Sequence, residues 1–261
     1  MRIALGLEYS GAPFTGWQSQ PDGRGVQNAL ERALGAIADA PIGTIAAGRT
    51  DTGVHATLQV VHFDTEVSRP ETAWVRGVNS HLPPEVAVLW AHRVPAEFHA
   101  RYAARARHYT YLLAPRATRP ALLSARVGWY HRPLDVGAMR VAAAALAGTH
   151  DFSAFRAAEC QATSPVKTLL PVAVVADGEY IRFDFSANGF LHHMIRNIVG
   201  ALVYVGAGKA PPTWMAELLA ARDRTRAAPT FAADGLYLTG ADYDAKWGLP
   251  PTVRPVRLPI S

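Results

Sequence analysis

Apolar residues recur along the chain with two alternating periods, which predict its secondary structure. Alternate apolar positions from Ile3 to Tyr9 predict a strand, whereas the spacing from Val26 to Ile37 is helical. Pro41 disfavours helical geometry at the residue before it, so this helix should end there. Two short strands, a helix and a further strand are expected to follow at residues 44–47, 58–63, 71–78 and 86–91.

The second half of the chain repeats the same order of elements. Its expected strands and helices are strand 108–113, helix 136–147, strands 169–175 and 180–186, helix 191–205 and strand 236–238. Asp135 and Gly148 are the predicted N-cap and C-cap of the first of these helices. The order β-α-β-β-α-β therefore occurs twice, which is the ferredoxin-like split βαβ arrangement.

These patterns predict an α+β protein made of two ferredoxin-like halves, with a mixed, largely antiparallel sheet and flanking helices. The expected halves are residues 1–105 and 106–246, and residues 247–261 form an extended, proline-rich tail. A segment at residues 114–133 falls outside the repeat. It combines cations with flat rings, which suits phosphates and exposed bases, although a solvated connection with core aromatics explains it equally well; these residues are Arg116, Arg119, Arg126, Trp129, Tyr130 and Arg132.

Composition narrows the possible functions only slightly. A net charge of +5 suits a polyanionic partner but does not require one. Cys160 is the only cysteine, which excludes an internal disulfide and a cysteine-based metal cluster. Glu8 interrupts the apolar start of the chain, and no later apolar run reaches membrane-spanning length. We expect a cytoplasmic protein that makes no use of a membrane.

The strongest chemical signal is the polar loop G-R-T-D-T-G-V-H at residues 48–55, between two predicted strands. Its glycines allow backbone to approach a ligand closely, and Asp51 supplies a carboxylate. Spacing alone favours a simpler interpretation, in which Asp51 caps the turn of a long hairpin.

Tyr109 and Arg196 also have two interpretations each. Tyr109 alternates with Tyr111 and Leu113, as expected for the buried face of a strand. Arg196 forms a helical stripe with His192 and Gly200, which indicates either a solvent face or a functional face that Gly200 opens to close approach.

Two further patterns do not indicate ligand sites. Residues 206–209, G-A-G-K, resemble a phosphate-binding loop, but Ala210 replaces the required Ser or Thr and the segment follows a helix. His192 and His193 are neighbours on a predicted helix, where they cannot converge on one ion. We expect neither a metal nor a cofactor.

The run G-R-T-D-T-G-V-H-A resembles the signature of the tRNA pseudouridine synthase A family, which usually has alanine at the position of Thr52. Other segments resemble the same family in the same order along nearly the whole chain. They are F-T-G-W-Q-S-Q from Phe14, F-H-A-R-Y from Phe98, R-H-Y-T-Y from Arg107, D-F-S-A-F from Asp151, F-L-H-H-M-I-R-N-I-V-G from Phe190 and D-G-L-Y-L from Asp234. Ser10, where the family has aspartate, and Gly25, where it has serine or threonine, are departures.

The resemblance implies the pseudouridine synthase fold and a cofactor-free isomerase that converts uridine to pseudouridine at positions 38–40 of the tRNA anticodon stem-loop. It makes Asp51 the essential carboxylate, either as nucleophile at C1′ or as base at C2′ of the ribose. It also implies that Arg196 is the counter-ion of Asp51, that Arg49 positions the loop or a phosphate, and that Tyr109 stacks on the target base. The family is homodimeric.

Two other classes of function remain as alternatives. A pure RNA-binding module would use the same basic surface, but the glycine-flanked aromatic pattern of the common RNA-recognition fold is missing. A nucleoside or RNA glycosidase would also act at C1′, yet it normally needs a second carboxylate, and the loop around Asp51 offers one.

Overall fold

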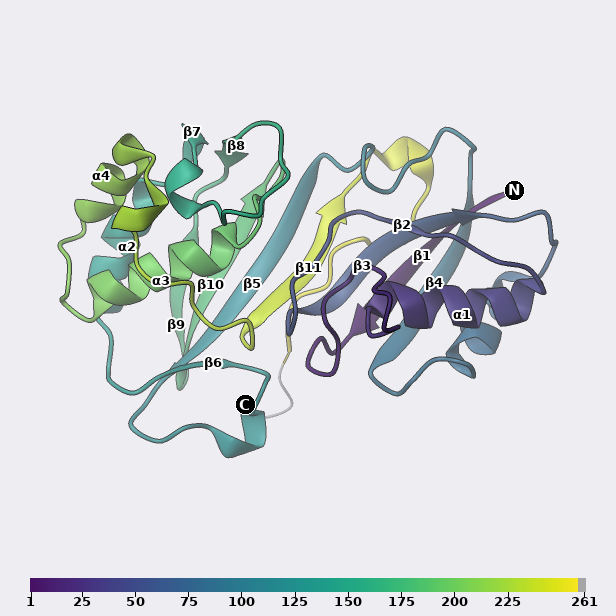
Figure 1. The fold of residues 1–261 in the computed structure, drawn as a ribbon, viewed down its shortest axis with the longest axis horizontal. Coiled ribbons are helices and arrows are strands. Elements are labelled where there is room, and N and C mark those ends of the chain that lie inside the picture. Colours follow the sequence, from purple (N-terminus) through teal and green to yellow (C-terminus); the bar gives the residue numbers. More distant parts are fainter. Residues whose placement is uncertain (258–261) are drawn as a thin grey trace. The chain divides into compact units, whose positions relative to one another are not determined.

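The computed structural model describes residues 1–257, which fall into two compact units. The first unit consists of residues 1–107 and 237–257, and the second of residues 108–236. Both combine strands and helices, so the predicted α+β class is confirmed (Figure 1). The last four residues of the predicted tail, 258–261, lie outside the described residues.

The first unit contains the split βαβ arrangement that the sequence predicts. Its sheet has the order β4-β1-β3-β11, and β1 is antiparallel to both β3 and β4. A short strand, β2 (Ile45–Ala46), pairs with β3 on that strand's second edge. β11 runs parallel to β3, with Tyr237 opposite His55. The long strands are β1 (Arg2–Tyr9), β3 (His55–Asp64), β4 (Val86–Val94) and β11 (Leu236–Asp242).

The helical segments of the first unit differ in regularity. Helix α1 (Val26–Ala38) has Gly25 as its N-cap in extended geometry, and the chain leaves the helix through a left-handed Asp39, shortly before Pro41. The helix expected at 71–78 is centred on a π-helical turn, η1 (Ala73–Gly77). A 3-10 turn, η5 (Ala245–Trp247), follows β11.

The second unit has a sheet in the order β5-β10-β8-β7, in which β9 also pairs with β10 and β6 with β5. Its elements are β5 (Ala106–Pro115), β6 (Gly128–Tyr130), β7 (Gly148–Asp151), β8 (Val166–Leu169), β9 (Ala173–Asp177), β10 (Tyr180–Ala187), α2 (Val136–Ala144), α3 (Met194–Gly206) and α4 (Trp214–Ala221), with 3-10 turns at η2 (Ala121–Leu123), η3 (Ser153–Phe155) and η4 (Arg224–Arg226).

Three details of the second unit differ from the sequence predictions. The single strand expected at 169–175 is two strands, because Pro171 cannot donate to a ladder. Asp135 caps α2 by accepting from the backbone N–H of Ala138, as predicted, but Gly148 is not the C-cap. The chain tightens into i→i+3 bonds after Ala144, and Gly148 begins β7 instead. Helix α4 was not predicted at all.

The boundary between the two halves differs from the prediction at β11. The sequence analysis places residues 236–238 in the second half, whereas most of β11 is grouped with the first unit through its pairing with β3. The tail is extended, as expected, and Val253 forms an isolated bridge with Gly240 of β11. Whether residues 105 and 246 bound functional domains stays a prediction.

Helix α3 is the central buried helix of the second unit, and one glycine allows another segment to approach it closely. Nearly all side chains of α3 are buried, and Gly200 faces the chain at residues 229–231. A Cβ atom on Gly200 would lie 2.4 Å from the carbonyl oxygen of Pro229. The close approach predicted for Gly200 is therefore confirmed, and the partner is backbone rather than ligand.

Gly200→Ala should destabilise the protein, although alanine is the better helix former by about 1 kcal/mol. The added methyl group must displace the Pro229 carbonyl, and overpacking of this kind costs about 1–3 kcal/mol. Urea unfolding measures the difference. Gly43→Ala is the control, because nothing lies within 4 Å of a Cβ atom there. Equal stability of the two variants would contradict the prediction.

Candidate active site

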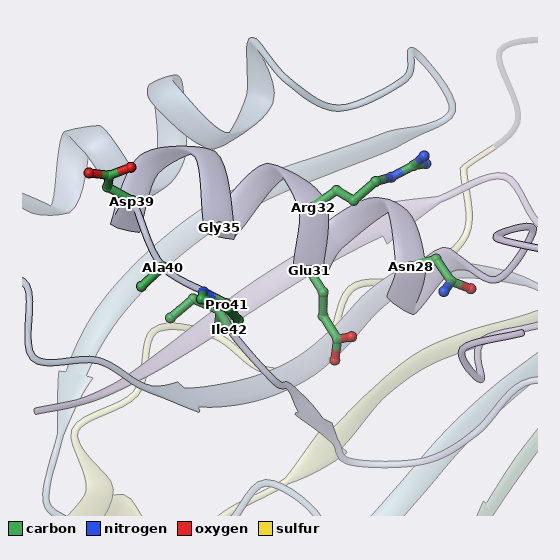
Figure 2. Close-up of a pocket in the computed structure, with 8 residues that line it drawn as sticks. All are labelled: Asn28, Glu31, Arg32, Gly35, Asp39, Ala40, Pro41 and Ile42. Atoms are coloured by element: carbon green, nitrogen blue, oxygen red, sulfur yellow. The ribbon is translucent and has the colours of Figure 1, made fainter. Parts of the chain in front are cut away.

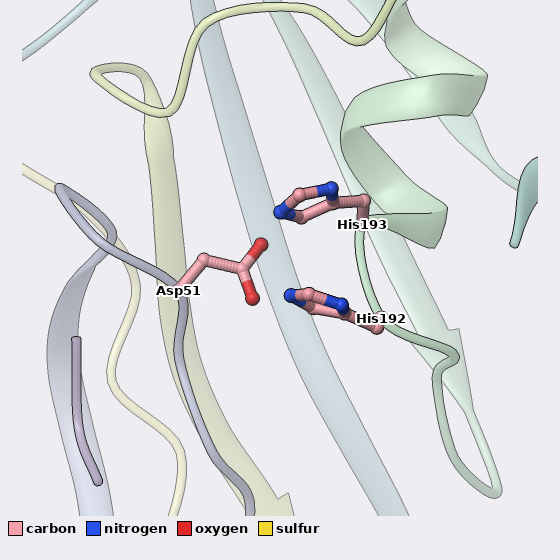
Figure 3. Close-up of side chains that lie close together, drawn as sticks. All are labelled: Asp51, His192 and His193. Atoms are coloured by element: carbon pink, nitrogen blue, oxygen red, sulfur yellow. The ribbon is translucent and has the colours of Figure 1, made fainter. Parts of the chain in front are cut away.

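Asp51 lies on the loop between β2 and β3, as the sequence predicts. Its side chain is partly buried, while Arg49 and Thr52 on either side are exposed. The backbone N–H of Val54 donates to the Asp51 carbonyl at 3.1 Å, and Gly53 supports this turn with a φ of +79°. Figure 3 shows the Asp51 carboxylate pointing away from the loop backbone. The loop therefore presents the carboxylate while its own backbone is internally bonded.

The loop is anchored by Thr50, the residue before Asp51. Its side chain is buried and its hydroxyl lies 2.8 Å from the hydroxyl of Tyr9, while its carbonyl accepts from the backbone N–H of Trp17 at 3.0 Å. Burial raises the pKa of Tyr9, so this phenol stays protonated. Gly16 leaves room for the Thr50 carbonyl group, because a Cβ atom at residue 16 would lie 2.8 Å from the Thr50 carbonyl oxygen.

The two ends of the loop are held as well. Gln59 donates to the Gly48 carbonyl at 2.6 Å, and Arg107 donates to the carbonyl of Ala47. At the other end, buried His55 accepts from the backbone N–H of Gly11 at 3.1 Å and stacks on Tyr237. These contacts fix the position of the Asp51 Cα atom.

Tyr109 lies on β5 in the second unit and is almost fully buried, at 8% exposure. Its ring packs edge-on against Phe190, with centroids 5.1 Å apart. Tyr111, two residues along the same strand, donates its hydroxyl to the Ala232 carbonyl at 2.9 Å, and burial raises its pKa. Tyr111 therefore has a structural role, because its hydroxyl bonds within the unit. Tyr109 is held in place by the packing of its ring on Phe190.

Arg196 lies in the first turn of α3 and is bound to the segment that crosses Gly200. Its Nε donates to the Phe231 carbonyl at 2.9 Å, and the Phe231 N–H donates to the Arg196 carbonyl at 3.2 Å. The solvent-face interpretation of the Arg196 and Gly200 stripe is wrong, because Gly200 is buried against Pro229. The reciprocal pair of hydrogen bonds orients the guanidinium group.

His192 and His193 precede α3, so the predicted helical stripe does not include His192. His193 has a φ of +61° at the N-cap position, and the two imidazole rings lie with centroids 4.0 Å apart (Figure 3). The two imidazole rings do not share a helix, so helical geometry does not keep them from binding one ion. The absence of a metal stays a prediction.

The basic segment at 114–133 is partly tied down. Trp129 donates its indole N–H to the Arg116 carbonyl at 2.8 Å, and Arg116 lies 3.6 Å from Glu179. Arg119, Arg126 and Arg132 are exposed. The cations that could meet a phosphate are thus on the surface, and a role in RNA binding stays a prediction.

A groove beside α1 is a poor candidate for chemistry. It is open to solvent and lined by residues such as Asn28, Glu31 and Arg32 (Figure 2). The Glu31 carboxylate accepts from the Thr44 backbone at 2.8 Å and from its hydroxyl at 3.0 Å, so it serves to hold the chain before β2.

Sequence reasoning missed the residues that support the candidates. Phe190 begins a segment with a family resemblance, but the pattern carries no sign that its ring packs on Tyr109. Phe231 acts through its backbone carbonyl, which no sequence pattern identifies.

Among the described residues, no helix is long and apolar enough to cross a membrane.

Comparisons with known proteins agree along the whole chain. The model of the tRNA pseudouridine synthase family matches residues 7–103 and 142–244. A tRNA pseudouridine synthase A from Thiobacillus denitrificans is 63% identical over 250 residues, covering 96% of both chains. Relatives of the same name from Chromobacterium violaceum and Methylobacillus flagellatus are 60% and 58% identical, over 99% and 100% of both chains.

The likeness to solved structures is weaker. A chain of an archaeal box H/ACA sRNP Nop10-Cbf5 complex matches with a TM-score of 0.36 and 11% identity, over 77% of this chain and 44% of that chain. A match at that level carries no argument about the chemistry. The family model and the full-length relatives do, and by them this chain belongs to the tRNA pseudouridine synthase family.

Proposed function

We propose that this chain isomerises uridine to pseudouridine in tRNA, at positions 38–40 of the anticodon stem-loop. The observation that carries the proposal is Asp51, in the loop that resembles the family signature and is pinned by Thr50, Gly48 and His55. A carboxylate that must act at one sugar carbon needs a fixed backbone beneath it, because misplacement by about 1 Å can cost a factor of about 100 in rate.

The reaction rearranges bonds within one nucleotide. The N1–C1′ bond breaks, uracil turns while it is retained, a C5–C1′ bond forms, and the proton on C5 leaves as N1 gains one. The Asp51 carboxylate acts either as nucleophile at C1′ or as base at C2′. The target nucleotide must leave its base stack to reach the protein, which is the usual route for chemistry on a base.

The other candidate residues act on the bound nucleotide. Tyr109 contacts the target base through its ring, which Phe190 holds at a fixed angle, and its hydroxyl serves near the C5 proton. Arg196 supplies positive charge that keeps the catalytic carboxylate ionised once water is excluded. Arg49 is exposed beside Asp51 and meets a phosphate.

The chain works as a cytoplasmic homodimer without metal or cofactor. The net charge of +5 supports a polyanionic substrate, and a tRNA is large enough to contact two subunits. Carboxylate chemistry at the sugar requires no metal-activated water.

Incubation with unmodified tRNA that carries tritium at uracil C5 should release tritium into water but no free uracil, because the base is retained. Asp51→Asn should lower the rate by more than about 1,000-fold at unchanged tRNA affinity, since the amide keeps the shape but is neither nucleophile nor base. A chelator should change nothing. Release of uracil would indicate a glycosidase. If folded protein releases neither tritium nor uracil, it is an RNA-binding module.

Tyr109→Phe should bind tRNA normally but release tritium roughly 100-fold more slowly, because the ring and its contact with Phe190 survive while the hydroxyl is lost. Tyr180→Phe, on a distant part of the same unit's sheet, serves as the control. Single-turnover rates separate chemistry from product release. If Tyr109→Phe reacts as fast as wild type, the hydroxyl has no chemical part.

Arg196→Ala should abolish detectable turnover, because the carboxylate loses its supporting positive charge. Arg196→Lys should recover part of the activity, since it keeps the charge but not the planar group that binds the Phe231 carbonyl through Nε. An unchanged rate in Arg196→Ala would exclude this role.

A further inference from the structure

An exposed aromatic side chain stands on a tight turn in the first unit, away from any core. Tyr102 is 76% exposed, yet its ring is not loose. It lies nearly flat on the imidazole of His99, with centroids 4.3 Å apart and an angle of 29° between the planes. The Arg101 guanidinium group lies 5.6 Å from the centre of the same ring. We call these three side chains the Tyr102 platform.

The turn that carries the platform is rigidly bound to the core of the unit. Phe98, just before it, is fully buried against Tyr243 and Trp247. The Ala100 N–H donates to the Nδ1 of His62 at 3.1 Å, and the Ala100 carbonyl accepts from the Tyr243 hydroxyl at 2.6 Å. An aromatic ring on such a support loses little freedom when it binds a ligand.

His99 is held as a neutral ring. Its Nδ1 accepts the backbone N–H groups of Arg101 and Tyr102, each at 3.2 Å, which requires an unprotonated nitrogen. Burial and the nearby Arg2 and Arg101 lower the pKa of His99. Tyr102 is therefore backed by an uncharged aromatic ring, and the cation of the platform is Arg101.

A rigid exposed ring next to a guanidinium group is suited to binding an unpaired nucleotide. Unpaired bases stack on aromatic faces, and the adjoining phosphate meets the cation. A packing role would instead bury the ring, as it does for Phe98.

The platform is tied to the base of the Asp51 loop within the same unit. Arg107 donates to the carbonyls of Arg101 and Ala104 in the turn and also to the carbonyl of Ala47. Ala47 precedes Asp51 by four residues, which span at most roughly 14 Å. The platform and the base of the Asp51 loop are therefore joined through one arginine side chain.

We propose that Tyr102 and Arg101 form a second nucleotide-binding site, separate from Asp51, which stacks an unpaired base of the tRNA and contacts its phosphate. This inference rests on the proposed tRNA substrate. It adds a contact that places the substrate and takes no part in bond rearrangement.

Tyr102→Ala should weaken tRNA binding by roughly 10- to 100-fold, the usual range for one stacked base. The effect should appear in KM for tritium release with kcat nearly unchanged. Tyr102→Phe keeps the stacking ring and should bind as wild type does. Arg101→Ala should reduce the slope of log affinity against log salt concentration by about one. Val141→Ala, which trims a side chain that is 65% exposed on α2, is the negative control.

The outcomes distinguish this proposal from the proposed function. If wild-type protein binds and converts tRNA while Tyr102→Ala does so with equal KM, the platform has no role, and the synthase activity stands. If wild-type protein neither binds nor converts tRNA, both proposals fail. If Tyr102→Phe loses as much affinity as Tyr102→Ala, the stacking role is also overturned, because the phenylalanine ring can still stack on a base. Matching circular dichroism spectra establish that each variant is folded.

Discussion

The burial of Thr50 is the constraint on which the Asp51 loop depends. A polar loop between two strands would normally sample many conformations, since its residues have water as an alternative partner. Here the Thr50 hydroxyl contacts the Tyr9 hydroxyl and the Thr50 carbonyl accepts from the Trp17 N–H, while Gly16 leaves room for the carbonyl. The residue before the carboxylate thus belongs to the core, and the carboxylate itself does not.

In the second unit, an irregular segment is also held in place, but by side-chain hydrogen bonds. The segment around Phe231, which orients Arg196, has little regular structure of its own. Arg224 donates to the Ala228 carbonyl and to the Thr230 hydroxyl, and it also binds the side-chain oxygen of buried Asn197 on α3. Side-chain hydrogen bonds thereby replace a strand ladder, because each buried carbonyl still requires a donor.

These contacts explain why segments with a family resemblance contain residues that are bonded within the protein. Gly16 and Trp17 belong to one such segment, yet they hold the backbone of Thr50 from beneath. Asn197 belongs to another and bonds to Phe155 and Arg224. A family signature in this fold thus records the support of an active loop as much as its chemistry.

The sequence by itself determined the class, the order of elements in the first half and Asp51 as the principal candidate, because these depend on periodicity and on a short contiguous motif. It also identified Asp135 as an N-cap, since that contact spans three residues. It failed at residues 169–175 and at Gly148, where Pro171 and an early 3-10 turn overrode the apolar pattern. Only the tertiary structure decided that Gly200 faces Pro229, that Phe190 holds Tyr109 and that Tyr102 stands exposed on His99. Each of these joins residues by packing or by a backbone group, and neither leaves a periodic trace in the sequence.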